Sequence, residues 1–222
     1  MIDLLSEKRV LVFAKAPVLG EVKTRLQPWV DQAQSVLIHR AMVKHTMNRL
    51  VDSMAAAVVD TIELWAGSTH PWWQELAKEY GVAVFQQQGS ALGERMCNAG
   101  SDALQRSSSV LIIGTDCPYI TLDYLRRALV VLEENDCVLG PAEDGGYVLI
   151  GLKQAQPDIF AGVNWGSEKV LDQTRARLQQ LRLAWGELEV LSDIDRPEDL
   201  QKLFSVMPAL ASEFDVELMA GV

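Results

Sequence analysis

The chain alternates between short runs of apolar, β-branched residues and longer stretches in which apolar side chains recur every three or four positions. The first pattern is typical of buried strands and the second of amphipathic helices. Residues 9–14 are apolar on both faces, as central strands of a parallel sheet are. Because such strands and helices alternate, the sequence predicts a three-layer α/β/α sandwich around a mostly parallel sheet.

The other predicted elements continue this alternation. Further strands are predicted at residues 61–65, 82–85, 110–113 and 188–191. Helices are predicted at residues 32–51, 92–104, 121–134 (with Thr121 as N-cap), 168–181 and 197–204, and a short one after Pro71. An acidic hairpin within residues 136–152 adds antiparallel pairing, which makes the predicted sheet mixed. Residues 208–222 form either a short helix or a mobile tail.

Composition narrows the class of protein. The 222 residues, 49% of them hydrophobic, suit one α/β domain over residues 1–222. A net charge of -10 repels polyanions, so we expect neither nucleic acid nor an anionic membrane as partner. No apolar run approaches the roughly 20 residues that span a bilayer, and no signal peptide is apparent. The three cysteines lack the spacing of zinc or disulfide sites, which suggests a cytoplasmic location.

The most informative residue is Asp116, which follows the predicted strand at residues 110–113. Gly114 lets the backbone turn there, and Pro118 ends any further pairing. Ligands of open α/β sheets bind at the carboxyl ends of the strands, and Mg²⁺ joins carboxylates to phosphate oxygens. Asp116 is therefore a candidate ligand of Mg²⁺ or Mn²⁺. The alternative is a carboxylate that caps the next turn or helix.

A second acidic loop lies at the tip of the predicted hairpin. Glu143 and Asp144 precede Gly145 and Gly146, which can adopt positive φ and allow a ligand close to the backbone. Asp144 or Glu143 is a candidate to orient or deprotonate an acceptor hydroxyl. The two glycines and Tyr147 are candidates for the acceptor or sugar site. An ordinary Asp-Gly turn is the alternative.

The loop after the first strand is rich in cations. Lys15, Lys23 and Arg25 are candidates to hold a di- or triphosphate, with Gly20 allowing close approach and Thr24 supplying a hydroxyl. The spacing matches neither a Walker A loop nor a dinucleotide fingerprint. A solvated basic loop is the alternative.

The start of the predicted helix at residues 92–104 is a third candidate. Leu92, Gly93 and Arg95 lie where backbone N–H groups favour anions or polar base edges. The alternative is a surface ion pair between Glu94 and Arg95.

Two later motifs are open to two readings each. Trp165 is either a core residue or a platform for a sugar, and Ser167 caps the helix that follows. Asp195 is either the N-cap of the last helix or a second metal ligand, should its loop fold beside Asp116.

Together these motifs resemble a glycosyltransferase A-type fold, and within it the bacterial rSAM/selenodomain-associated transferases, also described as arsenosugar-biosynthesis glycosyltransferases. The motifs are residues 13–17, Gly20, and residues 23–26, 92–96, 114–118, 140–147 and 165–166. The resemblance implies a nucleotide-diphosphate site in which Asp116 binds a divalent metal. Residues 193–200 are also similar to the terminal motif of nucleotidyltransferases acting on molybdopterin or phospholactate. Those enzymes open with a Gly-rich loop that this chain lacks.

We therefore expect a transferase that uses a nucleotide sugar, Mg²⁺ or Mn²⁺, and an unknown small-molecule acceptor. The metal would offset charge on the departing diphosphate, helped by the basic loop. Two alternatives stay open. One is a nucleotidyltransferase that joins a nucleoside triphosphate to a phosphorylated acceptor and releases pyrophosphate. The other is a nucleotide-binding module without catalysis.

Overall fold

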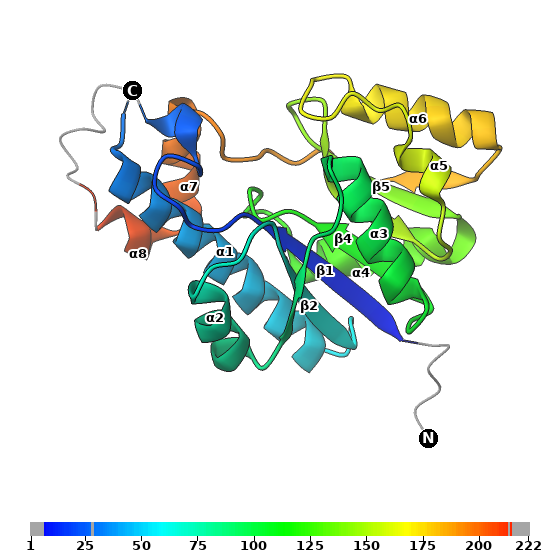
Figure 1. Cartoon of the computed structure of the whole chain (residues 1–222), viewed down its shortest axis with the longest axis horizontal. Helices are drawn as coiled ribbons and strands as arrows, with labels where there is room; N and C mark the ends of the chain where they lie inside the picture. The colour runs from blue at the N-terminus through cyan, green and yellow to red at the C-terminus, as the bar shows by residue number, and fades with distance from the viewer. Residues whose placement is uncertain (1–6, 28, 213, 215–222) are drawn as a thin grey trace.

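A computed structural model describes residues 7–27, 29–212 and 214, which form one mixed sheet with helices on both faces (Figure 1). The described strands lie in the order β3-β2-β1-β4-β6-β5-β7. Their bounds are β1 Lys8–Ala14, β2 Thr61–Ala66, β3 Ala83–Gln86, β4 Ser109–Ile113, β5 Cys137–Pro141, β6 Tyr147–Leu152 and β7 Trp185–Glu187. The predicted three-layer sandwich is confirmed.

Strand β6 gives the sheet its mixed character. It runs antiparallel to β4 and β5, whereas the other neighbouring strands among the described residues pair in parallel. The β5–β6 hairpin is the acidic turn predicted from the sequence. Its tip therefore lies at the same edge of the sheet as the carboxyl ends of β1 and β4.

Helices cover the two faces of the sheet with separate apolar clusters. One cluster joins the sheet to α1 (Gln32–Ala55), α2 (Trp72–Tyr80) and α4 (Leu122–Glu134). The other joins it to α3 (Leu92–Leu104), α5 (Pro157–Phe160) and α6 (Val170–Leu181). The Thr121 hydroxyl accepts from the Tyr124 N–H at 3.1 Å, so Thr121 caps α4 as predicted, and Asp116 does not.

A third apolar cluster lies beyond the carboxyl edge of the sheet. The amino-terminal part of α1 packs there with α7 (Leu200–Val206) and α8 (Pro208–Ala211), around Ile38, Met42 and Leu203. An extended segment, orange in Figure 1, crosses from the β5–β7 side of the sheet to this cluster, between the two upper parts of the molecule. Of the predicted tail, residues 208–211 are helical, and residues 213 and 215–222 lie outside the described residues.

The predicted strand at residues 188–191 is wrong in position. The paired strand is β7, and only Leu191 of the predicted run forms an isolated bridge, with Ala142. The run still follows β5, because Leu188 N–H donates to Leu139 C=O at 2.9 Å and Leu191 N–H to Pro141 C=O at 3.0 Å. Gly186 within β7 hid the true strand, since glycine weakens a strand pattern.

Several short elements also differ from the expected ones. Residues 24–26, expected as loop, and residues 197–199, expected as the start of a regular helix, form short 3₁₀ helices. The four-residue helix α5 was not predicted, because it carries too few apolar positions to show a period. Helix α6 begins at Val170 rather than at residue 168, with Lys169 as N-cap. The Ser167 hydroxyl donates to the Asn164 carbonyl at 2.7 Å and accepts from the N–H of Lys169 at 3.3 Å, so Ser167 holds the turn before α6 rather than the N-cap position itself.

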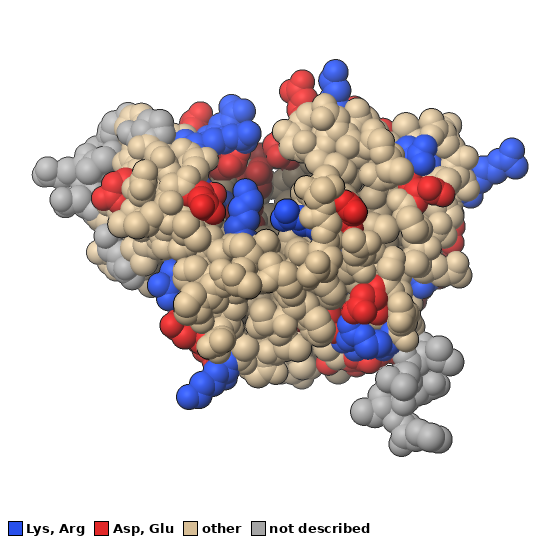
Figure 2. All heavy atoms as spheres, viewed as in Figure 1, with Lys and Arg blue, Asp and Glu red and all other residues tan. Residues whose placement is uncertain are grey.

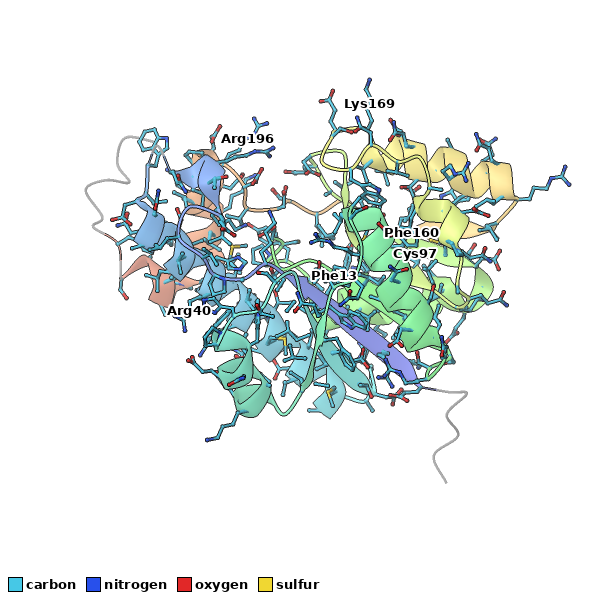
Figure 3. The ribbon with its side chains drawn as sticks, viewed as in Figure 1. Phe13, Arg40, Cys97, Phe160, Lys169 and Arg196 are labelled. Carbon is cyan, nitrogen blue, oxygen red and sulfur yellow. The ribbon has the colours of Figure 1, made fainter. Side chains whose placement is uncertain are left out.

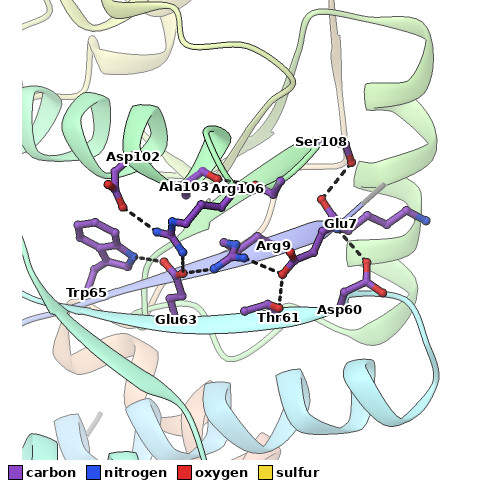
Figure 4. A network of polar contacts seen from close by, with 12 residues as sticks. Glu7, Arg9, Asp60, Thr61, Glu63, Trp65, Asp102, Ala103, Arg106 and Ser108 are labelled. Carbon is purple, nitrogen blue, oxygen red and sulfur yellow. Dashed lines mark hydrogen bonds and ion pairs between the residues drawn. The ribbon is translucent and has the colours of Figure 1, made fainter. Parts of the chain in front are cut away.

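The amino ends of the strands carry a buried ionic network (Figure 4). Glu63 on β2, with its side chain 2% exposed, accepts from Arg9 and, at 2.7 Å, from Arg106. Arg9 also pairs with Glu7 at 2.7 Å, and Arg106 with Asp102 at 2.7 Å. The network ties β1, β2 and the end of α3 together at the edge opposite the candidate site.

Candidate functional site

The candidate site lies at the carboxyl edge of the sheet, in a hollow between two parts of the molecule. Figure 2 shows this hollow with basic and acidic side chains on its walls. On one side lie α1 and α7, and on the other the β5–β6 turn and α6 (Figure 1). In Figure 3, Arg196 and Lys169 stand on opposite sides of its mouth. Ligands of open α/β sheets bind at this edge.

The segment 192–196 closes the floor of the hollow beside Asp116. Ile194 N–H donates to the Asp116 carbonyl at 2.8 Å, although the two residues are far apart in sequence. Ile194 is fully buried in the third cluster. In extended chain, successive side chains point to opposite sides. Asp193 and Asp195 therefore point away from the core, toward the hollow.

Asp116 carries a charge that water can reach. Its side chain is 60% exposed, and one carboxylate oxygen accepts from the ammonium of Lys23. Surrounding protein atoms raise the pKa of Asp116, but the Lys23 charge and hydrogen bond lower it more, so the net pKa lies below its usual value. Asp116 is thus a carboxylate at neutral pH, as a metal ligand must be.

Asp193 is the least compensated carboxylate of the group. Burial, followed by the negative charge of Asp144 and smaller contributions from Asp195 and Asp116, raises the pKa of Asp193 to about 6. The sequence analysis selected Asp195 and passed over Asp193. The signal was the Asp-Ile-Asp alternation, in which a buried Ile194 directs both neighbours to the open side.

The structure gives Asp195 a different partner from either predicted one. Its carboxylate accepts from Arg25, whose pKa this contact raises above its usual value. It does not cap the last helical region, because the Asp199 carboxylate accepts from the N–H groups of Asp195 and Arg196 at 3.1 and 2.9 Å. Asp195 does lie beside Asp116, as its metal role required.

The cations of the first loop separate into buried and exposed ones. Lys23 is buried, whereas Lys15, Thr24 and Arg25 are exposed. The Lys15 side chain has no carboxylate partner within the part of the chain that the structure describes. Gly20 adopts φ 78°, a left-handed conformation that suits glycine, and lies next to the Gln32 side chain.

His39 holds the backbone of this loop and was missed from the sequence. Its Nε2 lies 2.9 Å from the Lys15 carbonyl, which can only accept, so Nε2 carries the proton. Burial lowers the pKa of His39 below its ordinary value, so the ring is neutral at physiological pH. A histidine between apolar positions of a helix was the available signal, and it is a weak one.

The start of α3 presents an unpaired arginine. Arg95 donates through Nε to the Gly89 carbonyl at 3.0 Å and forms no ion pair with any described carboxylate. The alternative pairing with Glu94 is wrong, because Glu94 accepts from the Ser90 N–H and hydroxyl at 2.7 Å. Leu92 is 46% exposed beside it. Gly93 packs under Trp165, where a Cβ would lie 2.3 Å from the indole nitrogen.

The aromatic residues proposed for a sugar are half-buried and pack against the second apolar cluster. Trp165 packs on Gly93, lies 6.3 Å from the Phe160 ring, and contacts Tyr147 edge to face at 6.2 Å. The Tyr147 hydroxyl is buried, and burial raises its pKa above its usual value. Both rings are held by contacts within the protein but are partly exposed, so a role of either ring in sugar binding stays a prediction.

The acidic turn is held by its own contacts and by neighbouring segments. Glu143 N–H donates to the Leu191 carbonyl at 3.1 Å, and Leu171 N–H donates to the Gly145 carbonyl at 2.9 Å. Gly146 N–H donates to the Asp144 carboxylate at 2.8 Å, as in an Asx turn. A Cβ at Gly145 would lie 2.1 Å from the Glu168 carbonyl, so neighbouring chain, rather than a ligand, accounts for this glycine. Glu143 is exposed and lies 3.8 Å from the Lys202 ammonium.

The acidic residues suit a metal that a substrate helps to hold. Within residues 7–27, 29–212 and 214, no group of three or more His, Cys, Asp or Glu side chains could hold a metal ion. Mg²⁺ bound with nucleotides is usually held by one or two carboxylates plus phosphate oxygens. Asp116 and Asp193 lie on neighbouring segments, because the Ile194 N–H donates to the Asp116 carbonyl at 2.8 Å, and burial followed by nearby carboxylates raises the pKa of Asp193.

Known structures share this fold. The chain aligns with a putative nucleotide-diphospho-sugar transferase from Desulfovibrio desulfuricans at TM-score 0.82 and 28% identity, covering 97% of this chain and 98% of the other. A manganese complex of a Mycobacterium tuberculosis protein aligns at TM-score 0.52 and 16% identity, covering 90% and 98%. The fold is therefore that of nucleotide-diphospho-sugar transferases and their nucleotidyltransferase-like relatives.

Sequence comparisons add a functionally named relative and a family. A phosphoenolpyruvate guanylyltransferase from Sphaerobacter thermophilus is 28% identical over 197 residues, covering 87% of this chain and 92% of the relative. No described helix is long and apolar enough to cross a membrane. The resemblance to selenodomain-associated transferases stays a prediction. Residues 50–167 match a family described as uncharacterized proteins conserved in bacteria, DUF2064, and the chain belongs to that family.

Proposed function

We propose that this protein is a nucleotidyltransferase that joins the nucleoside monophosphate part of a nucleoside triphosphate to a small anionic acceptor. The observation that carries the proposal is the arrangement at the carboxyl edge of the sheet. There, Asp116 and Asp193 lie on neighbouring segments, and Lys15 after β1 and Arg95 at the start of α3 belong to the same edge without carboxylate partners among the described residues. Figure 2 shows basic and acidic side chains on the walls of the hollow at this edge. The guanylyltransferase relative supports this reaction over glycosyl transfer.

The unpaired cations would bind the triphosphate. Lys15 and Arg95 are free of described carboxylates, so they can offer charge-assisted hydrogen bonds to phosphate oxygens. The chain has a net charge of -10 and repels anions in general, so these cations make one edge of the sheet the place where an anion can bind. The carboxyl edges of β1 and β4 hold Lys15 and Asp116 close enough to influence each other's charge.

The reaction needs little proton transfer from the protein. An oxygen of the acceptor phosphate attacks the α-phosphorus, a new P–O–P link forms, the α–β phosphoanhydride bond breaks, and pyrophosphate leaves. Asp116 and Asp193 would hold Mg²⁺ or Mn²⁺, which supplies charge stabilisation for the departing pyrophosphate. Because a phosphate oxygen is already ionised at neutral pH, Asp144 and Glu143 need not act as bases. They would border the acceptor side instead.

A direct assay tests the proposal. The protein is incubated with each nucleoside triphosphate, Mg²⁺ or Mn²⁺, and phosphoenolpyruvate or other phosphorylated small acids, and pyrophosphate is measured. GTP with phosphoenolpyruvate is the first pair to try, because the relative is named for that reaction. We expect pyrophosphate only when acceptor and metal are both present. Nucleotide binding without any turnover would leave a non-catalytic binding module.

Glycosyl transfer from a nucleotide sugar is the second candidate. The Desulfovibrio structure, named a putative nucleotide-diphospho-sugar transferase, favours it. Glycosyl transfer would be supported if the protein releases nucleoside diphosphate from a nucleotide sugar and releases no pyrophosphate from nucleoside triphosphates.

A further inference from the structure

We propose that Lys23 is a positioning residue and not a phosphate ligand. Its buried ammonium fastens Asp116 and the segment 192–196 together at the floor of the hollow. The role of Asp116 in this proposal rests on the nucleotidyl transfer proposed above, whereas the fastening itself rests only on contacts within the chain. Lys15, in the same loop, is the cation left for phosphate.

The first argument is access. The Lys23 ammonium donates to Asp116 and, at 2.6 Å, to the Ile194 carbonyl, which lie 93 and 171 residues away in sequence. Its side chain is 3% exposed. A phosphate could reach this ammonium only by breaking both contacts, whereas the exposed Lys15 has no carboxylate to release.

The second argument is the backbone. Lys23 adopts φ 49° and ψ 37°, a left-handed conformation that residues other than glycine, asparagine and aspartate seldom take. Its neighbours Val22 and Leu26 are buried, so the loop is anchored on both sides. The conformation directs the Lys23 side chain under the edge of the sheet. Strained backbone of this kind persists where the surrounding structure holds it in place.

The third argument is charge. Asp116 lies on one segment, and on the other Asp193 and Asp195 flank Ile194, whose N–H donates to the Asp116 carbonyl at 2.8 Å. Lys23 offsets the charge of Asp116 and also donates to the carbonyl of Ile194, which lies between Asp193 and Asp195 in the sequence. Together with the bond from Ile194 N–H to the Asp116 carbonyl, it joins two segments that would otherwise repel each other. One oxygen of Asp116 stays free for a metal or solvent.

Two matched variants separate positioning from phosphate binding. Lys23→Met and Lys15→Met remove the same charge from the same loop. Hydrogen–deuterium exchange of the Ile194 amide needs no substrate and reports the fastening directly. We expect the Ile194 amide to exchange about 10-fold faster in Lys23→Met, because local opening governs exchange. In Lys15→Met its exchange rate should not change.

Kinetics with GTP, Mg²⁺ and phosphoenolpyruvate provide the second readout. Lys23→Met should lower kcat about 10-fold or more and change KM for GTP less than about 3-fold, since it displaces Asp116 without removing a ligand of GTP. Lys15→Met should raise KM for GTP about 10-fold, the effect of one charge-assisted contact. If the protein turns over no substrate, the proposed function fails, but hydrogen–deuterium exchange at Ile194 still tests whether Lys23 fastens the two segments. The two proposals can therefore fail separately.

Lys23→Arg covers the case in which Lys23→Met does not fold. It keeps the charge, but a guanidinium does not fit the space of an enclosed ammonium, so exchange at Ile194 should still rise. Unchanged exchange at Ile194 in the folded Lys23 variants would overturn the proposal. So would a loss of GTP affinity in Lys23→Met equal to that in Lys15→Met, because both variants would then act through phosphate.

Discussion

Two clusters of acidic and basic side chains lie at opposite ends of the same strands and differ in how completely their charges are paired. At the amino ends, Glu63 is 2% exposed and accepts from two arginines, each of which also pairs with another carboxylate. At the carboxyl ends, Asp116 is 60% exposed and Lys15 has no described carboxylate partner. Burial, followed by neighbouring carboxylates, raises the pKa of Asp193 there.

The difference shows that charged residues alone do not mark a site. A buried network in which opposite charges meet is satisfied from within and gains little from a ligand. A cluster with excess negative charge on one wall and unpaired cations on another gains from a metal and an anion together. The three variants below test this contrast, because Asp116→Asn and Asp193→Asn should both change turnover, whereas Glu63→Gln should change stability alone.

Asp116→Asn should have the largest effect, and on turnover. Removal of the charge that holds the metal should lower pyrophosphate release about 1000-fold, because charge stabilisation by a metal is worth several kcal/mol. Stability should also fall, because the buried Lys23 ammonium loses its charged partner, but by less than in a fully buried pair, since Asp116 itself is open to water. Asp123→Asn on the surface of α4 is the control, with turnover unchanged. Full activity in Asp116→Asn would return this aspartate to a structural role.

Glu63→Gln should come second, and act on stability alone. Removing one charge from a buried network leaves its partners uncompensated, at a cost of about 3 kcal/mol in the free energy of unfolding. Denaturant unfolding measures this loss, and turnover per folded molecule should not change. Asp102→Asn is the matched control, because Asp102 is 53% exposed and such surface pairs contribute less than about 1 kcal/mol. Equal losses in the two variants would mean that the network is not satisfied from within.

Asp193→Asn should have the smallest effect on stability, and should raise it, while the loss of a proposed metal ligand should lower turnover. The folded-state pKa of Asp193 is about 6, above its ordinary 3.8, so its contribution to stability is present at low pH and lost as pH rises through about 6. Above that pH the variant should be more stable by about 1 kcal/mol. This value is smaller than the pKa shift alone would give, because water reaches the Asp193 carboxylate. Melting temperatures at pH 4 and pH 7.5 measure it. If the melting temperatures of the variant and the unmodified protein differ by the same amount at both pH values, uncompensated charge on Asp193 is not the cause.

The sequence by itself determined the layers and the edge of the sheet at which the site lies. Apolar runs and helical spacing depend on local composition, so β1, β4 and α3 appear where the pattern predicted them. The position of Asp116 at a strand end follows from the same local pattern, with Gly114 and Pro118 around it. The short paired strand β7 was misplaced because its pairing with β5 is a long-range contact that a glycine-containing run does not signal.

Only the tertiary structure decided which candidate side chains meet and which are free. Lys15, Lys23 and Arg25 look alike in sequence, yet one is exposed, one is buried against Asp116 and Ile194, and one pairs with Asp195. The choice between Asp193 and Asp195 as an open carboxylate also depends on Arg25, some 170 residues earlier. Charge pairing is a property of distances in space, and sequence separation does not encode those distances.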